Sequence, residues 1–146
     1  MHTIAVIALK GGAGKTTVAT HLALAAKLRG KDVMIVDIDP QRSAMDVIGA
    51  REGEKPACVA STGGKLLSAK FAAEGLGKDL LIIDTPAGAV DDVSEAIVLA
   101  DLAVMVVRPT MLDLAGLLRT LTLTRKLGRA TTVIVNQAPV PREGIE

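Results

Sequence analysis

The stretch that decides the fold runs Lys10-Gly11-Gly12-Ala13-Gly14-Lys15-Thr16-Thr17. It follows the continuously apolar segment 4–9, which predicts a strand buried on both faces, and it opens a predicted helix over 15–29 that stops at Gly30. Glycines allow the backbone to curl so that its N–H groups point inward, and the helix start adds about half a positive charge. Strand, glycine loop and helix in this order predict a loop that binds phosphate groups.

Single residues of this loop have distinct predicted roles. Lys15 is expected to bridge the β- and γ-phosphates of a nucleotide, Thr16 to bind Mg²⁺ through its hydroxyl, and Thr17 to reach the α-phosphate. The ordinary phosphate-loop pattern has a glycine five positions before Gly14, where this chain has Leu9. The other residues expected to surround the phosphates are Lys10, Gly11, Gly12, Ala13 and Gly14.

Short apolar runs alternate with helical patterns along the rest of the chain. This alternation predicts an α/β fold of three layers, a parallel sheet with helices on both faces, in a single domain of residues 1–146. Further strands are predicted over 33–36, 80–83, 102–107 and 132–135, further helices over 43–48, 64–73, 91–100 and 112–127, and 50–62 is the least regular segment.

The carboxyl ends of the strands form the edge of such a sheet where ligands bind. Polar or glycine-rich clusters follow four of the predicted strands, at 10–17, 37–41, 84–88 and 136. Since parallel strands end at the same edge, we expect the four clusters to meet there.

The composition excludes several classes of protein. The chain has 146 residues and a net charge of +1, with a single aromatic residue, Phe71, and a single cysteine, Cys58. A platform that stacks nucleic-acid bases needs more aromatic faces, and a disulfide framework or an iron–sulfur cage needs more cysteines. The most apolar stretch, 96–107, is too short to cross a bilayer, and no Lys or Arg precedes the first apolar segment. The expected compartment is the cytoplasm.

The Lys-Gly-Gly-x-Gly-Lys-Thr-Thr form of the loop resembles the deviant Walker A box of the ParA/MinD family of P-loop ATPases, and the likeness extends over about residues 3–136. The resemblance implies a chain that binds ATP or ADP with Mg²⁺, forms a homodimer around ATP and hydrolyses it slowly. In that family the early lysine, here Lys10, reaches across the dimer to the partner's nucleotide. A solvated loop cation is the alternative for Lys10.

Acidic residues at two strand ends fit the same resemblance. The segment 37–41, Asp-Ile-Asp-Pro-Gln, resembles switch I, which implies that Asp39 positions or activates the attacking water and that Asp37 belongs to the Mg²⁺ shell. Asp84 ends a strand that resembles Walker B and is implied to hold Mg²⁺ through water, with switch II at 86–88. The alternative for Asp37 is a carboxylate that caps the following turn.

Two further positions match the family. Asn136 stands where the family hydrogen-bonds adenine, with an ordinary turn asparagine as the alternative. The segment 108–110 and Asp113 match positions near the dimer face.

Within the family, residue chemistry separates the roles. Nitrogenase-type iron proteins, arsenite-pump ATPases and iron–sulfur scaffold ATPases rely on cysteines, and the related tyrosine kinases need a tyrosine cluster, which this chain does not have. The resemblance therefore implies a ParA-like ATPase in plasmid or chromosome partitioning. It also implies a ParB-like partner that stimulates the ATPase, non-specific DNA binding and association with the nucleoid. Two alternatives stay open: a MinD-like positioning ATPase, although no membrane-binding amphipathic segment is seen, and a nucleotide-dependent scaffold for a partner protein.

The basic residues near the chain's end have two interpretations. They contact the phosphate backbone of DNA, or they stabilise the end of the predicted helix 112–127 through its dipole. The family continues past Asn136 with another strand and helices, whereas 139–144 has the pattern of a loop. We therefore expect a C-terminally truncated chain or a short natural variant. The basic residues are Arg119, Arg125, Lys126 and Arg129.

Overall fold

A parallel sheet of six strands forms the centre of the computed structural model, which describes residues 1–88 and 90–139. The strand order is β3-β2-β4-β1-β5-β6, and every neighbouring pair is parallel. The predicted α/β class is confirmed. The strands are β1 (His2–Ile7), β2 (Val33–Asp37), β3 (Ala57–Ala60), β4 (Leu80–Asp84), β5 (Leu102–Val107) and β6 (Ala130–Val135).

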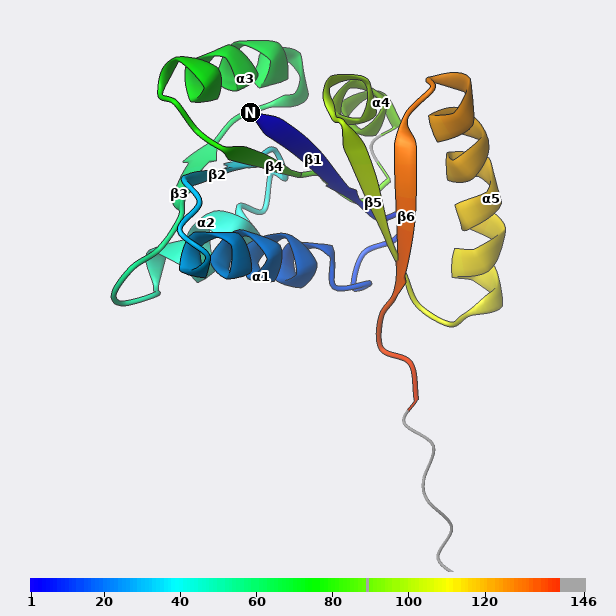
Figure 1. The fold of residues 1–146 in the computed structure, drawn as a ribbon. Helices are drawn as coiled ribbons and strands as arrows, with labels where there is room; N and C mark the ends of the chain where they lie inside the picture. The colour runs from blue at the N-terminus through cyan, green and yellow to red at the C-terminus, as the bar shows by residue number, and fades with distance from the viewer. Residues whose placement is uncertain (89, 140–146) are drawn as a thin grey trace, which may run out of the picture.

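Helices cover both faces of the sheet, which gives the three predicted layers (Figure 1). On one face, α1 (Lys15–Leu28) and α2 (Ser43–Gly49) pack through buried alanines and Ile48. On the other face lie α3 (Leu66–Gly75), α4 (Val90–Leu99) and α5 (Met111–Lys126), with the short 3-10 helix η1 (Gly63–Lys65) ahead of α3. None of the helices in the described part of the chain is both long and apolar enough to cross a membrane.

The core is aliphatic, as the composition requires. Ile35, Ile82 and Ile83 in the central strands have no exposed surface, and the burial of one such side chain contributes about 2 kcal/mol. Because β1, β2, β4 and β5 are covered on both faces, most of each strand is apolar without alternation (4–7, 33–36, 80–83 and 102–107), which is why these strands were predictable from continuous apolar runs.

The structure differs from the prediction at the start of the chain and in the irregular segment. The first strand covers 2–7 rather than 4–9, because the chain leaves the sheet after Ile7 to form the loop. Ala8 lies outside the strand but still packs in the core, so the apolar run in the sequence continues past the end of the strand. A strand, β3, lies within 50–62, where none was predicted. It is a four-residue edge strand held by β2, and most of its residues are exposed. The loop predicted at 139–144 lies largely outside the described residues.

The four polar clusters meet at the carboxyl edge of the sheet, as predicted. The registers of the central strands set Val6 beside Asp84 and Asp37 beside Asp84. Neighbours in register point to the same face of a sheet, so both carboxylates lie on the face covered by α1 and α2. The site is therefore built where β1, β2 and β4 end.

Candidate phosphate-binding site

The glycine loop curls between β1 and α1 by means of left-handed backbone at two positions. Gly12 has a φ of +79° and Gly14 a φ of +91°, conformations that L side chains rarely adopt. A Cβ atom at Gly14 would also clash with the Nδ2 atom of Asn136. Gly14 is the N-cap of α1 and gives no side-chain cap, so the first N–H groups of the helix stay available to an anion.

Two side chains from the start of α1 converge on one carboxylate. The Nζ atom of Lys15 lies 3.0 Å from Oδ1 of Asp84, and the Thr16 hydroxyl donates to Oδ2 of Asp84 at 2.7 Å. Lys15 is 7% exposed and Asp84 is fully buried. Burial raises the pKa of Asp84, against the lowering effect of the Lys15 ammonium and the Thr16 hydrogen bond. Asp84 is thus a buried carboxylate that a cation stabilises.

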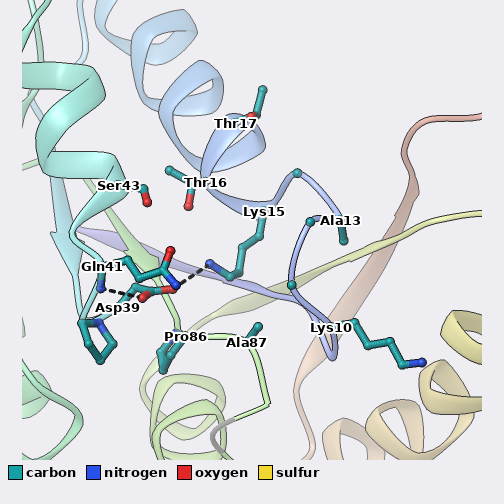
Figure 2. Close-up of a pocket in the computed structure, with 14 residues that line it drawn as sticks. Lys10, Ala13, Lys15, Thr16, Thr17, Asp39, Gln41, Ser43, Pro86 and Ala87 are labelled. Carbon is teal, nitrogen blue, oxygen red and sulfur yellow. Dashed lines mark hydrogen bonds and ion pairs between the residues drawn. The ribbon is translucent and has the colours of Figure 1, made fainter.

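Asp39 faces the same group from the loop after β2. Its Oδ2 atom lies 3.8 Å from Nζ of Lys15, and its Oδ1 atom accepts a hydrogen bond from the Gln41 backbone N–H at 2.9 Å. Figure 2 shows Asp39 and Lys15 directed toward each other across the cavity. The Asp39 side chain is 19% exposed, so water can reach the carboxylate.

Asp37 is engaged in a different way from Asp39. It is fully buried, and its carboxylate accepts hydrogen bonds from the backbone N–H groups of Asp39, Ala44 and Met45, at 3.0 to 3.1 Å. Two of these donors, Ala44 and Met45, belong to the first turn of α2, so the Asp37 carboxylate accepts from N–H groups that the helix itself leaves without partners. The turn-capping alternative therefore describes the Asp37 carboxylate in this structure, and its place in a Mg²⁺ shell stays a prediction.

These residues line a cavity of about 490 Å³, a volume in the range of small-molecule sites. The whole loop from Lys10 to Thr17 lines the cavity. The rest of the lining includes Asp39 and Ser43 from the segment after β2, and Pro86 and Ala87 from the segment after β4. It is the space that a phosphate chain would fill. Thr17 lines it from the first turn of α1, and its contact with an α-phosphate stays a prediction.

Lys10 belongs to the loop, but its side chain takes the opposite direction from Lys15. Figure 2 shows its ammonium directed away from Lys15, on the other side of the loop. Lys10 is exposed. The two lysines of the motif therefore both line the cavity, but their ammonium groups are directed apart.

The ends of β5 and β6 contact the loop from its outer side. Asn136 donates through Nδ2 to the backbone carbonyl of Ala13 at 2.9 Å, and Gln137 donates through Nε2 to the carbonyl of Gly12 at 2.8 Å. In this structure Asn136 thus contacts the loop backbone, and its contact with adenine stays a prediction. Gln137 was not among the predicted site residues, because no motif marks it: only the fold brings it to the loop.

Arg108 and Asp113 form an ion pair beside these contacts. The Nε and Nη2 atoms of Arg108 donate to the Asp113 carboxylate at 3.0 and 3.3 Å, and the Arg108 backbone N–H donates to it at 3.0 Å. The Arg108 hydrogen bonds lower the pKa of Asp113 to about 2. Nη1 of Arg108 lies 3.8 Å from the position of a Cβ atom at Gly12, so the pair adjoins the loop.

The donors present fit a magnesium ion bound together with a phosphate chain. Mg²⁺ takes oxygen ligands and is usually held by one or two protein groups, with waters and phosphates completing the shell. The Thr16 hydroxyl and the buried Asp84 carboxylate already lie 2.7 Å apart. Among the described residues, no group of three or more His, Cys, Asp or Glu side chains is arranged to hold a metal ion.

A curled glycine loop at a helix N-terminus, with a buried lysine and a strand-end aspartate, defines a P-loop nucleotide-binding domain. The family model of the CobQ/CobB/MinD/ParA nucleotide-binding domain matches residues 4–144, and the chain belongs to this family.

Individual relatives match parts of the chain. The maintenance of carboxysome distribution protein A of Gloeobacter kilaueensis is 40% identical over 124 residues, which cover 80% of this chain and 54% of that protein. The chromosome-partitioning ATPase Soj of Thermus thermophilus is 48% identical over 48 residues, or 33% of this chain and 19% of Soj. A putative replication protein A of Rhizobium rhizogenes matches over 13% of its own length. The chain thus spans about half or less of these relatives.

Solved structures agree in fold. The septum site-determining protein MinD of Pyrococcus horikoshii, in complex with Mg-ADP, superposes with a TM-score of 0.75 over 92% of this chain and 69% of that one. The two sequences are 20% identical, so this likeness concerns the fold alone.

Proposed function

We propose that the chain is a ParA-type switch ATPase: it binds Mg·ATP in the cavity around the phosphate loop, dimerises, and hydrolyses the nucleotide slowly. The observation that carries the proposal is the convergence of Lys15 and Thr16 on the buried Asp84, at the end of a loop with left-handed glycines. The buried lysine, the hydroxyl and the buried carboxylate meet at the helix start, where an anion and its metal ion would bring a further partner to each of them.

Lys15 changes partner when a nucleotide binds, according to this proposal. It now contacts Asp84 and Asp39, and phosphate oxygens would replace these carboxylates as its hydrogen-bond acceptors. Thr16 and Asp84 would hold Mg²⁺, directly and through water respectively, and the bound ion would neutralise charge on the phosphates.

Asp39 is proposed to orient the attacking water. Once Lys15 turns to the phosphates, the Asp39 carboxylate is free at the cavity wall, while the Gln41 N–H keeps it in place. Phosphoryl transfer depends on position and charge more than on covalent chemistry, so an oriented water at this carboxylate suffices for slow hydrolysis.

Lys10 is proposed to contact the nucleotide of a second subunit. The direction of its side chain supports this role, because the ammonium is exposed and points away from Lys15 (Figure 2). The Lys10→Ala variant should still bind ATP but should stay monomeric with ATP, as measured by light scattering. The matched control is Lys31→Ala, which removes an exposed lysine after α1. An ATP-dependent dimer in the Lys10 variant would contradict the role.

Partitioning of plasmid or chromosomal DNA is the proposed cellular role, with a ParB-like partner that stimulates hydrolysis and with non-specific binding to nucleoid DNA in the cytoplasm. The names of the relatives, a chromosome-partitioning ATPase and a carboxysome distribution protein, support a role in distributing a cargo. The exposed cations at the end of α5 support a DNA contact.

The experiment that tests the function is sizing of the chain with Mg·ATP, with Mg·ADP and without nucleotide, each with and without duplex DNA. The partition role predicts a dimer with ATP only, DNA bound by that dimer only, and hydrolysis stimulated by DNA together with the partner. A dimer that ignores DNA would favour the scaffold or MinD-like alternatives. The same size in all conditions would contradict the switch.

A further inference from the structure

The end of β6 meets the phosphate loop through two successive side chains. Asn136 and Gln137 donate to the carbonyls of Ala13 and Gly12, two successive peptide groups of the loop. The contacts join parts of the chain that are 123 and 125 residues apart in sequence. The loop is thus held from outside by a pair of amide donors on a neighbouring part of the sheet edge.

These contacts set the direction of the loop's N–H groups. In a planar trans peptide, the carbonyl of one residue and the N–H of the next point in opposite directions. When the carbonyls of Gly12 and Ala13 face Gln137 and Asn136, the N–H groups of Ala13 and Gly14 therefore point away from β6. Neither N–H donates to another protein group in the described part of the chain. They are available to phosphate oxygens.

The backbone of Gln137 is itself unusual. Its φ is +57°, in the left-handed region that glycine and asparagine enter more easily than glutamine. Asn136 still continues the β5–β6 ladder, since its N–H donates to the carbonyl of Val107 at 2.8 Å. The turn at Gln137 thus comes immediately after the ladder, in a backbone conformation that is strained for glutamine. Asparagine would adopt this left-handed backbone with less strain than glutamine. The longer side chain of glutamine, however, allows the amide to reach the carbonyl of Gly12.

We propose that Gln137 is a positioning residue: its amide holds the Gly12–Ala13 peptide in the orientation that aims the Ala13 N–H at the phosphates of a bound nucleotide. The inference rests on the proposed function, because it concerns the same nucleotide. According to this inference, a residue just after β6 and outside the glycine motif helps to fix the conformation of the loop. Substitution of Gln137 should therefore weaken the binding of the phosphate chain and leave the binding of the base unchanged.

The test compares two substitutions at this position. Gln137→Met keeps the length of the side chain and removes the donor. Gln137→Asn keeps an amide and suits the left-handed backbone better, but it is one methylene too short to reach Gly12. The control is Thr132→Ala, an exposed position within β6 that pairs with Val104 and precedes the end of the strand. Titration calorimetry of the full chain with Mg·ADP and with magnesium tripolyphosphate, which has no base, gives the affinities.

Both Gln137 variants should bind Mg·ADP and tripolyphosphate more weakly, each by about fivefold, the factor that corresponds to one neutral hydrogen bond. The melting temperature of Gln137→Asn should stay equal to or above that of the unchanged chain, because its backbone strain is lower. Full affinity in Gln137→Asn would overturn the inference, since Gln137 would then only shape the turn. Weaker binding of ADP but not of tripolyphosphate would also overturn it, because Gln137 would then act on the base.

A second readout needs no ligand. In the ¹⁵N–¹H spectrum of the nucleotide-free chain, the Ala13 amide resonance should shift in both Gln137 variants and stay in place in Thr132→Ala. An unchanged Ala13 resonance would overturn the inference whatever the affinities are. If the unchanged chain binds neither probe, the proposed function fails and takes this inference with it. If the chain binds and the variants do not differ from it, the inference alone fails.

Discussion

At the scale of single residues, Lys15 is the side chain on which the site depends. It is nearly buried and has two carboxylate neighbours, Asp84 at 3.0 Å and Asp39 at 3.8 Å. Since burial raises the pKa of Asp84 and the Lys15 ammonium opposes this, the two groups stabilise each other before any ligand binds. A ligand that takes over Lys15 must leave another cation with Asp84, which is the place proposed for Mg²⁺.

The Lys15→Ala variant should lose nucleotide binding. It removes a charge-assisted contact to the phosphates, which corresponds to a loss in affinity of about 100-fold, or about 2.7 kcal/mol. Calorimetry with Mg·ADP measures the loss, and Lys31→Ala, an exposed lysine outside the site, is the control. An unchanged affinity would mean that the phosphates do not lie in the cavity beside Lys15.

The Asp39→Ala variant should bind ATP and fail to hydrolyse it, so that the dimer persists. The substitution removes the carboxylate at the cavity wall and leaves the loop and Asp84 unchanged. Phosphate release over time measures hydrolysis, and sizing measures the dimer. Asp39→Asn is the informative companion, because it keeps the hydrogen bond to the Gln41 N–H and removes the charge. Hydrolysis at the unchanged rate in Asp39→Ala would exclude its role with water.

At the scale of elements, the start of α5 is stabilised by more than its helical sequence. Thr110 is the N-cap and accepts from the Asp113 N–H, while the Asp113 carboxylate holds Arg108 in front of the helix. Asp113 is 4% exposed, and Arg108 lies beside Gly12 of the loop. Through Arg108, the first turn of α5 therefore adjoins the phosphate loop, and the last turn of the same helix carries Arg125 and Lys126.

The Asp113→Asn variant should be less stable than the unchanged chain at neutral pH. The pKa of Asp113 is lowered from 3.8 to about 2, chiefly by its hydrogen bonds with Arg108. A lowered pKa in the folded state contributes stability above the unfolded pKa, and this stability is lost as the pH falls through the folded pKa. The difference in stability between the two chains should therefore close between about pH 4 and pH 2.

Denaturant unfolding at several pH values measures this difference. Glu52→Gln, which removes an exposed charge in a loop, is the control and should show no such change in that interval. A difference that stays constant from pH 7 to pH 2 would mean that the Asp113 charge is not what stabilises the helix start.

The elements also show how far the sequence predicts this molecule. The predicted bounds of β4 and β5 agree with the structure to within one residue, because a strand that is buried on both faces has an uninterrupted apolar sequence. β3 was missed for the opposite reason: Ala57 and Ala60 are exposed at the edge of the sheet, and pairing with β2 rather than burial makes the segment a strand.

The site was predictable to the extent that it is local. Lys15, Thr16 and Gly14 follow from a contiguous motif, and Asp84 from its place at the end of an apolar strand. The capping of α2 by Asp37 was foreseen only as an alternative, since a carboxylate at a strand end serves a metal or a helix equally well in sequence. Gln137 had no signal at all, because its contact with Gly12 joins positions 125 residues apart.

At the scale of the whole molecule, charge is distributed unevenly although the net charge is only +1. Four exposed cations lie in the second half of α5 or shortly after it, and α5 covers β6 at one edge of the sheet (Figure 1). Cations at a helix C-terminus also stabilise the helix by about 0.3–1 kcal/mol each. An experiment must therefore separate DNA affinity from helix stability.

Charge reversal at the end of α5, by Arg125→Glu together with Lys126→Glu, should weaken binding of duplex DNA by the ATP-bound chain. The slope of log affinity against log salt should fall by about 2, one for each lost phosphate contact. Lys27→Glu together with Lys31→Glu makes the same change in net charge near the end of α1 and is the control. Equal loss of affinity in both double variants would show a general charge effect and no DNA surface on α5.

The pairing of β1, β2 and β4 has a consequence for how this protein can fail. Asp84 pairs with Val6 on one side and with Asp37 on the other, so the register of the strands fixes the position of the Asp84 carboxylate next to the loop. Slippage by a single residue would turn that acid to the opposite layer of helices while most of the aliphatic interior could still pack. A variant with shifted strand register should therefore lose nucleotide binding while it is still folded. A normal melting curve alone would not show that the site is intact.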